Sequence, residues 1–217
     1  MLESRPLWER PTLQAAAGDT LRPGGFALTD RAAEIMGMNP GWRVLDVGCG
    51  LGATVGRLRS RFGAKAYGVE ASHSQISRSG RSGLIRALGD VLPFTGDSFN
   101  AVFCECVLSL LSDPCAGVAE FARVLEPGGF LALSDLCGPG GKGGVSCADR
   151  AVPLEETRTM VEDAGFSVVM LEDHSCLLKD LTARLMFAGE NGLACGCGQS
   201  QLGYFLMIAE KKGSRHV

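Results

Sequence analysis

Short apolar runs alternate with amphipathic segments along the chain from residue 43 onward. The amphipathic segments place apolar residues at helical spacing, most clearly at Val118, Phe121, Ala122 and Leu125, and we expect them to form helices. Alternation of strands and helices predicts a parallel sheet with helices on both faces. The predicted strands are Val44–Val47, Ala66–Val69, Leu84–Leu88, Ala101–Cys104, Phe130–Ser134, Phe166–Leu171 and Tyr204–Ala209, and helices are predicted over 53–62, 72–82, 154–164 and 177–188.

Residues 1–28 lack this alternation and contain several prolines and glycines. We expect an irregular lead-in with one short helix near Leu13–Gly18. Either Thr29 or Asp30 can cap a further helix, which would end near Asn39-Pro40. There is no internal repeat and no long linker, so residues 1–217 are predicted to form a single domain.

Composition narrows the classes of protein that fit this pattern. Apolar residues make up 46% and charged residues 21% of the 217 positions, as in ordinary globular proteins. The net charge is −3 and aromatic residues are few, which argues against a nucleic-acid partner. Seven basic residues between Arg57 and Arg86 are then the solvated face of two helices. Neither a membrane-spanning run nor a secretory leader is evident, and we expect a cytoplasmic protein without membrane association.

The segment Val44-Leu-Asp-Val-Gly-Cys-Gly-Leu-Gly52 lies where the first strand turns into a helix. Gly48 and Gly50 allow a sharp turn and a close approach of the backbone to a ligand, beside the free N–H groups of the helix start. Glu70 ends the second strand, 22 residues after Gly48. A carboxylate at that position can accept both ribose hydroxyls, as in dinucleotide folds. The combination predicts a nucleotide site.

This segment resembles the first motif of the class I S-adenosylmethionine-dependent methyltransferases, in a type 11-like, cysteine-rich variant. Three later segments follow the same pattern in order: Leu92-Pro-Phe with Asp97-Ser-Phe99, Val124-Leu-Glu-Pro-Gly-Gly129 and Ala164-Gly-Phe166. The resemblance covers about residues 25–211. An NAD-linked oxidoreductase is the third alternative, and both the glycine spacing and the Leu-Glu-Pro-Gly-Gly segment argue against it.

The resemblance implies a three-layer α/β, Rossmann-like fold with a mostly parallel seven-stranded sheet. In this fold the last strand runs antiparallel and lies between the fifth and sixth strands. The connection through residues 172–203 alone does not decide the direction of that strand. S-adenosylmethionine would be the cofactor and S-adenosylhomocysteine the product. Glu70 would bind the ribose hydroxyls of the cofactor, and the backbone of Gly48 and Gly50 would pack on its methionine portion. Ala71 would line the adenine. Asp46 would face the amino group of the cofactor. Asp90 either binds the adenine amino group or is a turn residue after Gly89. The predicted cofactor-binding set is Asp46, Gly48, Cys49, Gly50, Glu70, Ala71, Asp90, Cys104 and Glu105.

Nine cysteines are the feature that a plain methyltransferase explains least. Most follow strand ends, where ligands bind in doubly wound sheets. One hypothesis is that Cys147, Cys195 and Cys197 hold a soft metal or metalloid as thiolates, although the Cys-x-x-Cys pairs of ordinary zinc sites are absent. The alternative is that free cysteines act as small apolar residues, which we favour for Cys49, Cys104, Cys115 and Cys176.

The leading prediction is a methyltransferase that moves the methyl group to a small-molecule acceptor by in-line displacement. Residues 1–28, 136–152 and 172–202 flank the predicted site and would cover the substrate. No catalytic base is assigned, because a capping or solvated role is favoured for both His73 and His174. The alternatives are a non-catalytic cofactor- or metal-binding protein that keeps the fold, and a methyltransferase acting on a cysteine-held metalloid such as arsenite.

Overall fold

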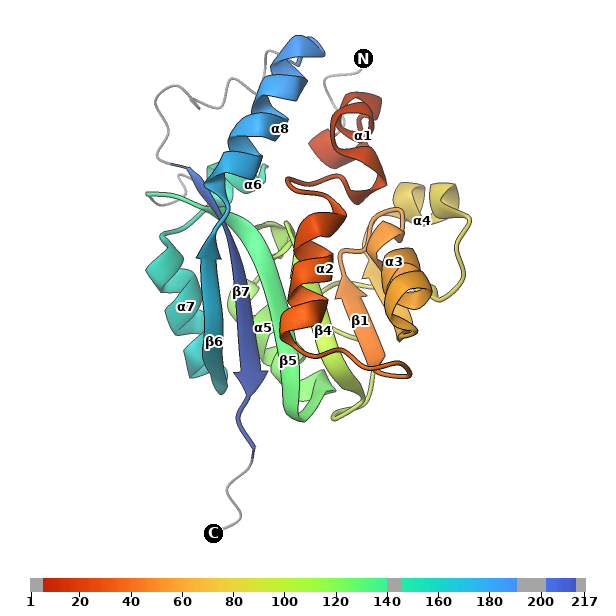
Figure 1. Cartoon of the computed structure of the whole chain (residues 1–217), viewed down its shortest axis with the longest axis vertical. Helices are drawn as coiled ribbons and strands as arrows, with labels where there is room; N and C mark the ends of the chain where they lie inside the picture. Colours follow the sequence, from red (N-terminus) through yellow and green to blue (C-terminus); the bar gives the residue numbers. More distant parts are fainter. Residues whose placement is uncertain (1–5, 140–145, 191–201, 214–217) are drawn as a thin grey trace.

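The computed structural model describes residues 6–139, 146–190 and 202–213 and contains one seven-stranded sheet (Figure 1). The strand order is β3-β2-β1-β4-β5-β7-β6. Strands β1 to β5 pair in parallel, whereas β7 runs antiparallel to both β5 and β6. This confirms the predicted fold class and the place and direction of the last strand. The strands are β1 Arg43–Val47, β2 Lys65–Glu70, β3 Leu84–Arg86, β4 Phe99–Glu105, β5 Leu125–Cys137, β6 Phe166–Asp173 and β7 Gly203–Lys211.

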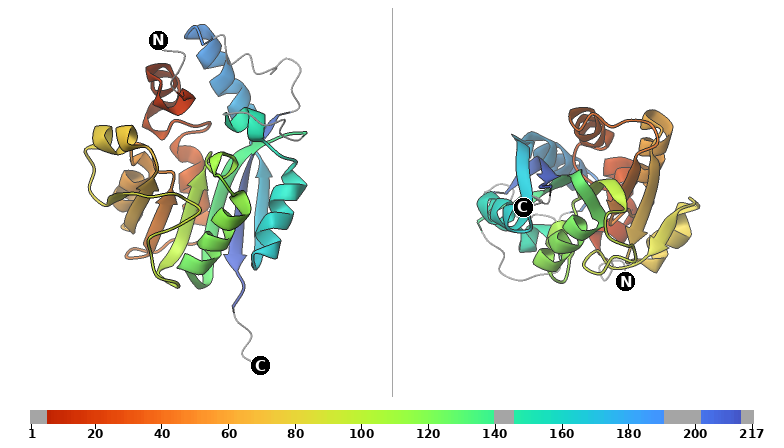
Figure 2. Two further views of the ribbon diagram at one scale, coloured as in Figure 1. Left: turned by 180° about the vertical axis from the view of Figure 1, so that it is seen from behind. Right: turned by 90° about the horizontal axis from the view of Figure 1, so that it is seen from below.

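Helices cover both faces of the sheet and form the outer two of three layers (Figure 2). On one face, Leu28 of α2 and Leu58 of α3 pack against the strands. On the other face, Phe121 of α5 and Val161 of α7 do so. The helices are α1 Pro11–Ala17, α2 Phe26–Ile35, α3 Ala53–Phe62, α4 His73–Ser79, α5 Pro114–Val124, α6 Cys147–Arg150, α7 Leu154–Asp163 and α8 Ser175–Phe187. In the described part of the chain, no helix is long and apolar enough to span a membrane.

The short helix predicted near Leu13–Gly18 is present as α1, which begins two residues earlier. Two 3-10 turns, Leu7–Glu9 and Gly18–Thr20, flank it and were not predicted. Leu13 of α1 is buried against Leu181 and Leu185 of α8, far away along the chain. This apolar contact stabilises a helix that is short for its own hydrogen bonds to hold it. Figure 1 shows α1 and α8 side by side above the carboxyl ends of the parallel strands.

Several predicted element boundaries also shift. Helix α2 begins at Phe26, one turn before the predicted caps, and its N-cap residue is Gly25. Neither predicted residue caps the helix, since Thr29 bonds to Glu105 and Asp30 accepts from Arg57. Leu125 was predicted on the helical face that includes Phe121, but it is the first residue of β5. Helix α6, within the predicted substrate-side loop, has only four residues and was not predicted.

Candidate functional site

A cavity of about 700 Å³ lies at the carboxyl ends of the parallel strands. The turns after β1, β2 and β4 form its floor, and residues from the N-terminal segment 6–22 line it as well. Parallel strands bring these turns to one edge of the sheet, which is the usual place for a ligand in this class of fold. The lining residues are Pro6, Trp8, Glu9, Asp19, Thr20, Leu21, Arg22, Asp46, Val47, Gly48, Cys49, Gly50, Ala53, Thr54, Val69, Glu70, Ala71, Ser72, Gln75, Ala87, Gly89, Glu105, Cys106, Val107, Leu110, Leu111 and Arg150.

The turn after β1 leaves no room for a side chain at Gly48. Its backbone has a φ of 70°, and a Cβ there would lie 2.3 Å from a methyl carbon of Val107. The N–H groups of Gly48 and Cys49 donate to the carbonyl oxygen of Val69, at 2.8 and 3.0 Å. Glycine is therefore required at this position both for the positive φ and for the close approach of Val107.

Glu70 ends β2 at the wall of the cavity. Its Oε2 accepts a hydrogen bond from the N–H of Gly50 at 3.0 Å, and its Oε1 accepts one from the N–H of Ser72 at 2.7 Å. These two bonds fix the carboxylate between the turns after β1 and β2. A carboxylate has about four acceptor positions, so it keeps capacity for the hydroxyl groups of a ligand.

Asp46 and Glu105 end neighbouring strands and bring two carboxyl groups to the cavity. Asp46 is only 4% exposed, and burial together with the nearby Glu105 raises its pKa well above the ordinary value. Arg22 reaches Glu105 from the N-terminal segment, with 2.6 Å between Nη2 and Oε2. This ion pair was not predicted, because a single arginine in a Gly/Pro-rich segment gives no local signal of its partner.

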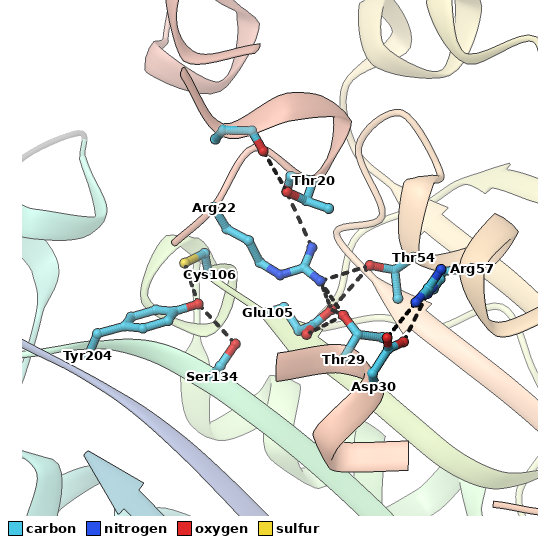
Figure 3. A network of polar contacts seen from close by, with 11 residues as sticks. Thr20, Arg22, Thr29, Asp30, Thr54, Arg57, Glu105, Cys106, Ser134 and Tyr204 are labelled. Carbon is cyan, nitrogen blue, oxygen red and sulfur yellow. Dashed lines mark hydrogen bonds and ion pairs between the residues drawn. The ribbon is translucent and has the colours of Figure 1, made fainter. Parts of the chain in front are cut away.

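Two threonines complete the buried network around this ion pair (Figure 3). The hydroxyl of Thr29 donates to Glu105 at 3.1 Å, and that of Thr54 donates to it at 3.2 Å. Arg22 Nη2 in turn donates to both threonine hydroxyls. The network therefore joins the N-terminal segment, α2, α3 and β4 directly beneath the cavity, and it holds the segment in place.

Comparison with known proteins supports an interpretation of this cavity. A family model described as "Methyltransferase domain" matches residues 45–133, which contain the turns after β1, β2 and β4. The chain is 28% identical over 229 residues to the methyltransferase GfsG of Streptomyces halstedii, covering 89% of this chain and 82% of that protein. It is also 28% identical over 171 residues to phosphoethanolamine N-methyltransferase 1 of Arabidopsis thaliana, covering 70% of this chain. Residues 45–133 are thus similar to a methyltransferase domain, and both of these relatives are methyltransferases.

Solved structures of similar fold match more of this chain than the family model does. The [4+2]-cyclase SpnF superposes with a TM-score of 0.73 at 24% identity, covering 86% of this chain and 80% of that one. A phosphoethanolamine N-methyltransferase 2 of Haemonchus contortus superposes with a TM-score of 0.76 at 18% identity, covering 93% of this chain and 56% of that one. Among the relatives by sequence, the chain spans 34% of the length of the Arabidopsis protein.

Seven of the nine predicted cofactor-binding residues line the cavity, and two do not. Cys104 is fully buried in the core beside α5, because side chains alternate along β4 and the next residue, Glu105, faces the cavity instead. Burial raises the pKa of the Cys104 thiol. Asp90 is partly buried and does not line the cavity, although its neighbour Gly89 does. This position fits the alternative of a turn residue.

The predicted substrate-side segments differ in what they add to the cavity. Residues 6–22 supply much of one wall, and Arg150 of segment 136–152 lines it too. In segment 172–202, the described residues (172–190 and 202) supply no lining residue, and α8 supports α1 instead. His174 contacts Glu172 and His73 contacts Ser77, and neither histidine lines the cavity.

The predicted cysteine cluster is described only in part. Cys147 begins α6 and is partly buried, whereas Cys195 and Cys197 lie outside the described residues. Within residues 6–139, 146–190 and 202–213, no three His, Cys, Asp or Glu side chains are grouped to hold a metal ion. Cys106 lines the cavity, and its thiol donates to the hydroxyl of Tyr204 at 3.3 Å. Burial raises the pKa of Cys106, so this thiol stays protonated.

Proposed function

We propose that this protein is a methyltransferase, which binds S-adenosylmethionine in the cavity and transfers its methyl group to a small-molecule acceptor. The observation that best supports this proposal is the charge of the side chains that line the cavity. Five carboxyl groups (Glu9, Asp19, Asp46, Glu70 and Glu105) face two guanidinium groups (Arg22 and Arg150), and the Arg22–Glu105 ion pair cancels one charge of each sign. An acid-rich cavity suits a cationic ligand, and S-adenosylmethionine carries a sulfonium and an ammonium group.

The residues of the two glycine-flanked turns would hold the cofactor. Glu70 would accept from the ribose hydroxyls, Ala71 would lie beside the adenine, and the backbone of Gly48 and Gly50 would pack on the methionine portion. Asp46 would face the amino group. S-adenosylmethionine supplies a methyl group already activated by its sulfonium, so the task of the chain is to align the acceptor, which can contribute roughly 7–11 kcal/mol.

Two observations favour a small acceptor, namely the size of the cavity and the activities for which the relatives are named. The N-terminal segment lines the cavity with Trp8, Thr20 and Leu21, which leaves about 700 Å³ for cofactor and acceptor together. A further relative, 29% identical over 177 residues, is the 27-O-demethylrifamycin SV methyltransferase of Amycolatopsis mediterranei. No observation on the described residues favours the non-catalytic or the metalloid alternative. The cytoplasmic location and the lack of a nucleic-acid partner stay predictions.

Calorimetric titration of the reduced protein with S-adenosylmethionine, S-adenosylhomocysteine and NAD tests the proposal. We expect the first two to bind and NAD not to bind. Failure of both S-adenosyl compounds to bind would refute the proposed function, and binding of NAD alone would favour the oxidoreductase alternative.

Replacing Glu70 by alanine tests the assignment of the cofactor site. Loss of a charged acceptor should weaken S-adenosylhomocysteine binding roughly ten- to hundredfold, from about 1.5–3 kcal/mol for such a bond. Glu156→Ala is the matched control, since Glu156 is exposed on α7 and does not line the cavity. Equal affinities of the two variants would mean that the ribose is held elsewhere.

A further inference from the structure

Arg150 lines the cavity from the substrate side of the sheet edge. It is the last residue of α6, a single turn whose start is fixed by a capping box between Ser146 and Asp149. Its Nη1 donates to the carbonyl oxygen of Leu110 at 3.0 Å, and its Nη2 donates to that of Leu111 at 2.6 Å. The guanidinium is therefore held at the end of the 3-10 turn Leu108–Leu110, which follows β4.

The partners of Arg150 leave its charge and part of its donor set available. None of the ion pairs among residues 6–139, 146–190 and 202–213 includes it. Two neutral carbonyl groups use only two of its five N–H donors. The N–H of Nε and the second N–H of Nη2 form the other fork of the guanidinium, which matches the two oxygens of a carboxylate or phosphate. Arg22 differs from Arg150, because its charge is already neutralised by the ion pair with Glu105.

The strand order separates Arg150 from the proposed cofactor residues. Glu70 ends β2, whereas the guanidinium of Arg150 is bonded to the turn after β4, with β1 between these two strands. Two strand spacings amount to roughly 10 Å. The ribose and adenine would lie at the β2 end, so the β4–β5 end is left for the acceptor. Val107 and Leu110 line the cavity beside Arg150, and Leu21 lines it from the N-terminal segment.

From this arrangement we infer that Arg150 binds an oxyanion group, a carboxylate or a phosphate, carried by the methyl acceptor. The apolar body of the acceptor would contact Val107, Leu110 and Leu21 while the anionic group is held by the free fork of Arg150. The inference rests on the proposed function, since it names the class of acceptor. The carboxylate of the cofactor is the other oxyanion that matches this fork, and the experiment separates the two sources.

The probes are benzoate and phenyl phosphate, with benzyl alcohol as the neutral counterpart of similar shape. Each is titrated calorimetrically into the wild type, Arg150→Gln and Arg150→Lys, all saturated with S-adenosylhomocysteine. We expect at least one anion to bind the wild type roughly tenfold or more tightly than benzyl alcohol, as a charged hydrogen-bond pair implies. Arg150→Gln should lose that preference, and Arg150→Lys should keep part of it. Arg158→Gln removes an exposed guanidinium of α7 away from the cavity and should behave as the wild type.

Three outcomes would overturn the inference. One is that neither anion binds the wild type more tightly than benzyl alcohol. Another is that Arg150→Gln binds the anions as well as the wild type does. The third is that Arg150→Gln loses affinity for S-adenosylhomocysteine itself, which would make Arg150 a cofactor residue. Failure of the wild type to bind S-adenosylhomocysteine refutes the proposed function instead, and the anion titrations without it still test the oxyanion site.

Discussion

Replacing Arg22 by methionine should destabilise the protein strongly, because it leaves the carboxylate of Glu105 buried without its partner. The two side chains are only 5% and 3% exposed, and the ion-pair atoms are 2.6 Å apart. Breaking a buried pair by removing one partner costs about 3–5 kcal/mol. The total stability of a domain is about 5–15 kcal/mol. For a chain of this size, the melting temperature should fall by roughly 6–20 °C.

Urea unfolding followed by circular dichroism measures this effect, and an exposed pair supplies the control. Arg158 and Glu162 pair on the surface of α7 with side chains 43% and 42% exposed, so Arg158→Met should cost at most about 0.5 kcal/mol. The double variant Arg22→Met/Glu105→Leu removes both charges and should recover much of the loss. If Arg22→Met costs no more than Arg158→Met, the Arg22–Glu105 pair does not hold the N-terminal segment and our reasoning on the network is wrong.

Two further changes test the turn after β1 and the end of β5. In thermal unfolding, Gly48→Ala should lower the free energy of unfolding by about 1–3 kcal/mol more than Gly37→Ala does. Both glycines have a positive φ, but only a Cβ at position 48 would meet Val107. Equal losses of stability would contradict this packing argument. Burial raises the pKa of Asp135 from 3.8 to about 6, so its ionisation destabilises the folded state as pH rises between those values. The stability of the wild type relative to Asp135→Asn should therefore fall by about 2 kcal/mol between pH 4.5 and 7 in urea unfolding. A pH-independent difference would show that Asp135 titrates normally.

The sequence predicts those parts of the fold in which apolar residues recur at a regular spacing or in which glycines mark a turn. Strand β1 is a short apolar run buried on both faces, and the helical spacing of Val118 and Phe121 gives the core-facing side of α5. The glycine turn and Glu70 could be placed at one edge from spacing alone, because parallel strands bring successive turns together. Boundaries were less certain, as Leu125 shows: its apolar side chain fits either the end of a helix or the start of a strand.

The candidate site was predictable where one motif carries it and not where distant segments meet. Gly48, Gly50 and Glu70 lie within one β-turn-α-β unit, and all three line the cavity. Cys104 was misplaced because a shift of one position along a strand exchanges the two faces of the sheet. Arg22 and Arg150 lie far from that unit in sequence, and nothing near either residue indicates the cavity that they share.

The sequence by itself determined the class of fold, the edge of the sheet that holds the site and the glycine-flanked turns of the proposed cofactor pocket. These features depend on short-range periodicity and on turn chemistry, which neighbouring residues specify. Only the tertiary structure decided that the N-terminal segment closes the cavity through Arg22 and that Arg150 lines the same cavity. Ion pairs and apolar contacts between segments so far apart form only after the chain has folded, so no local pattern records them.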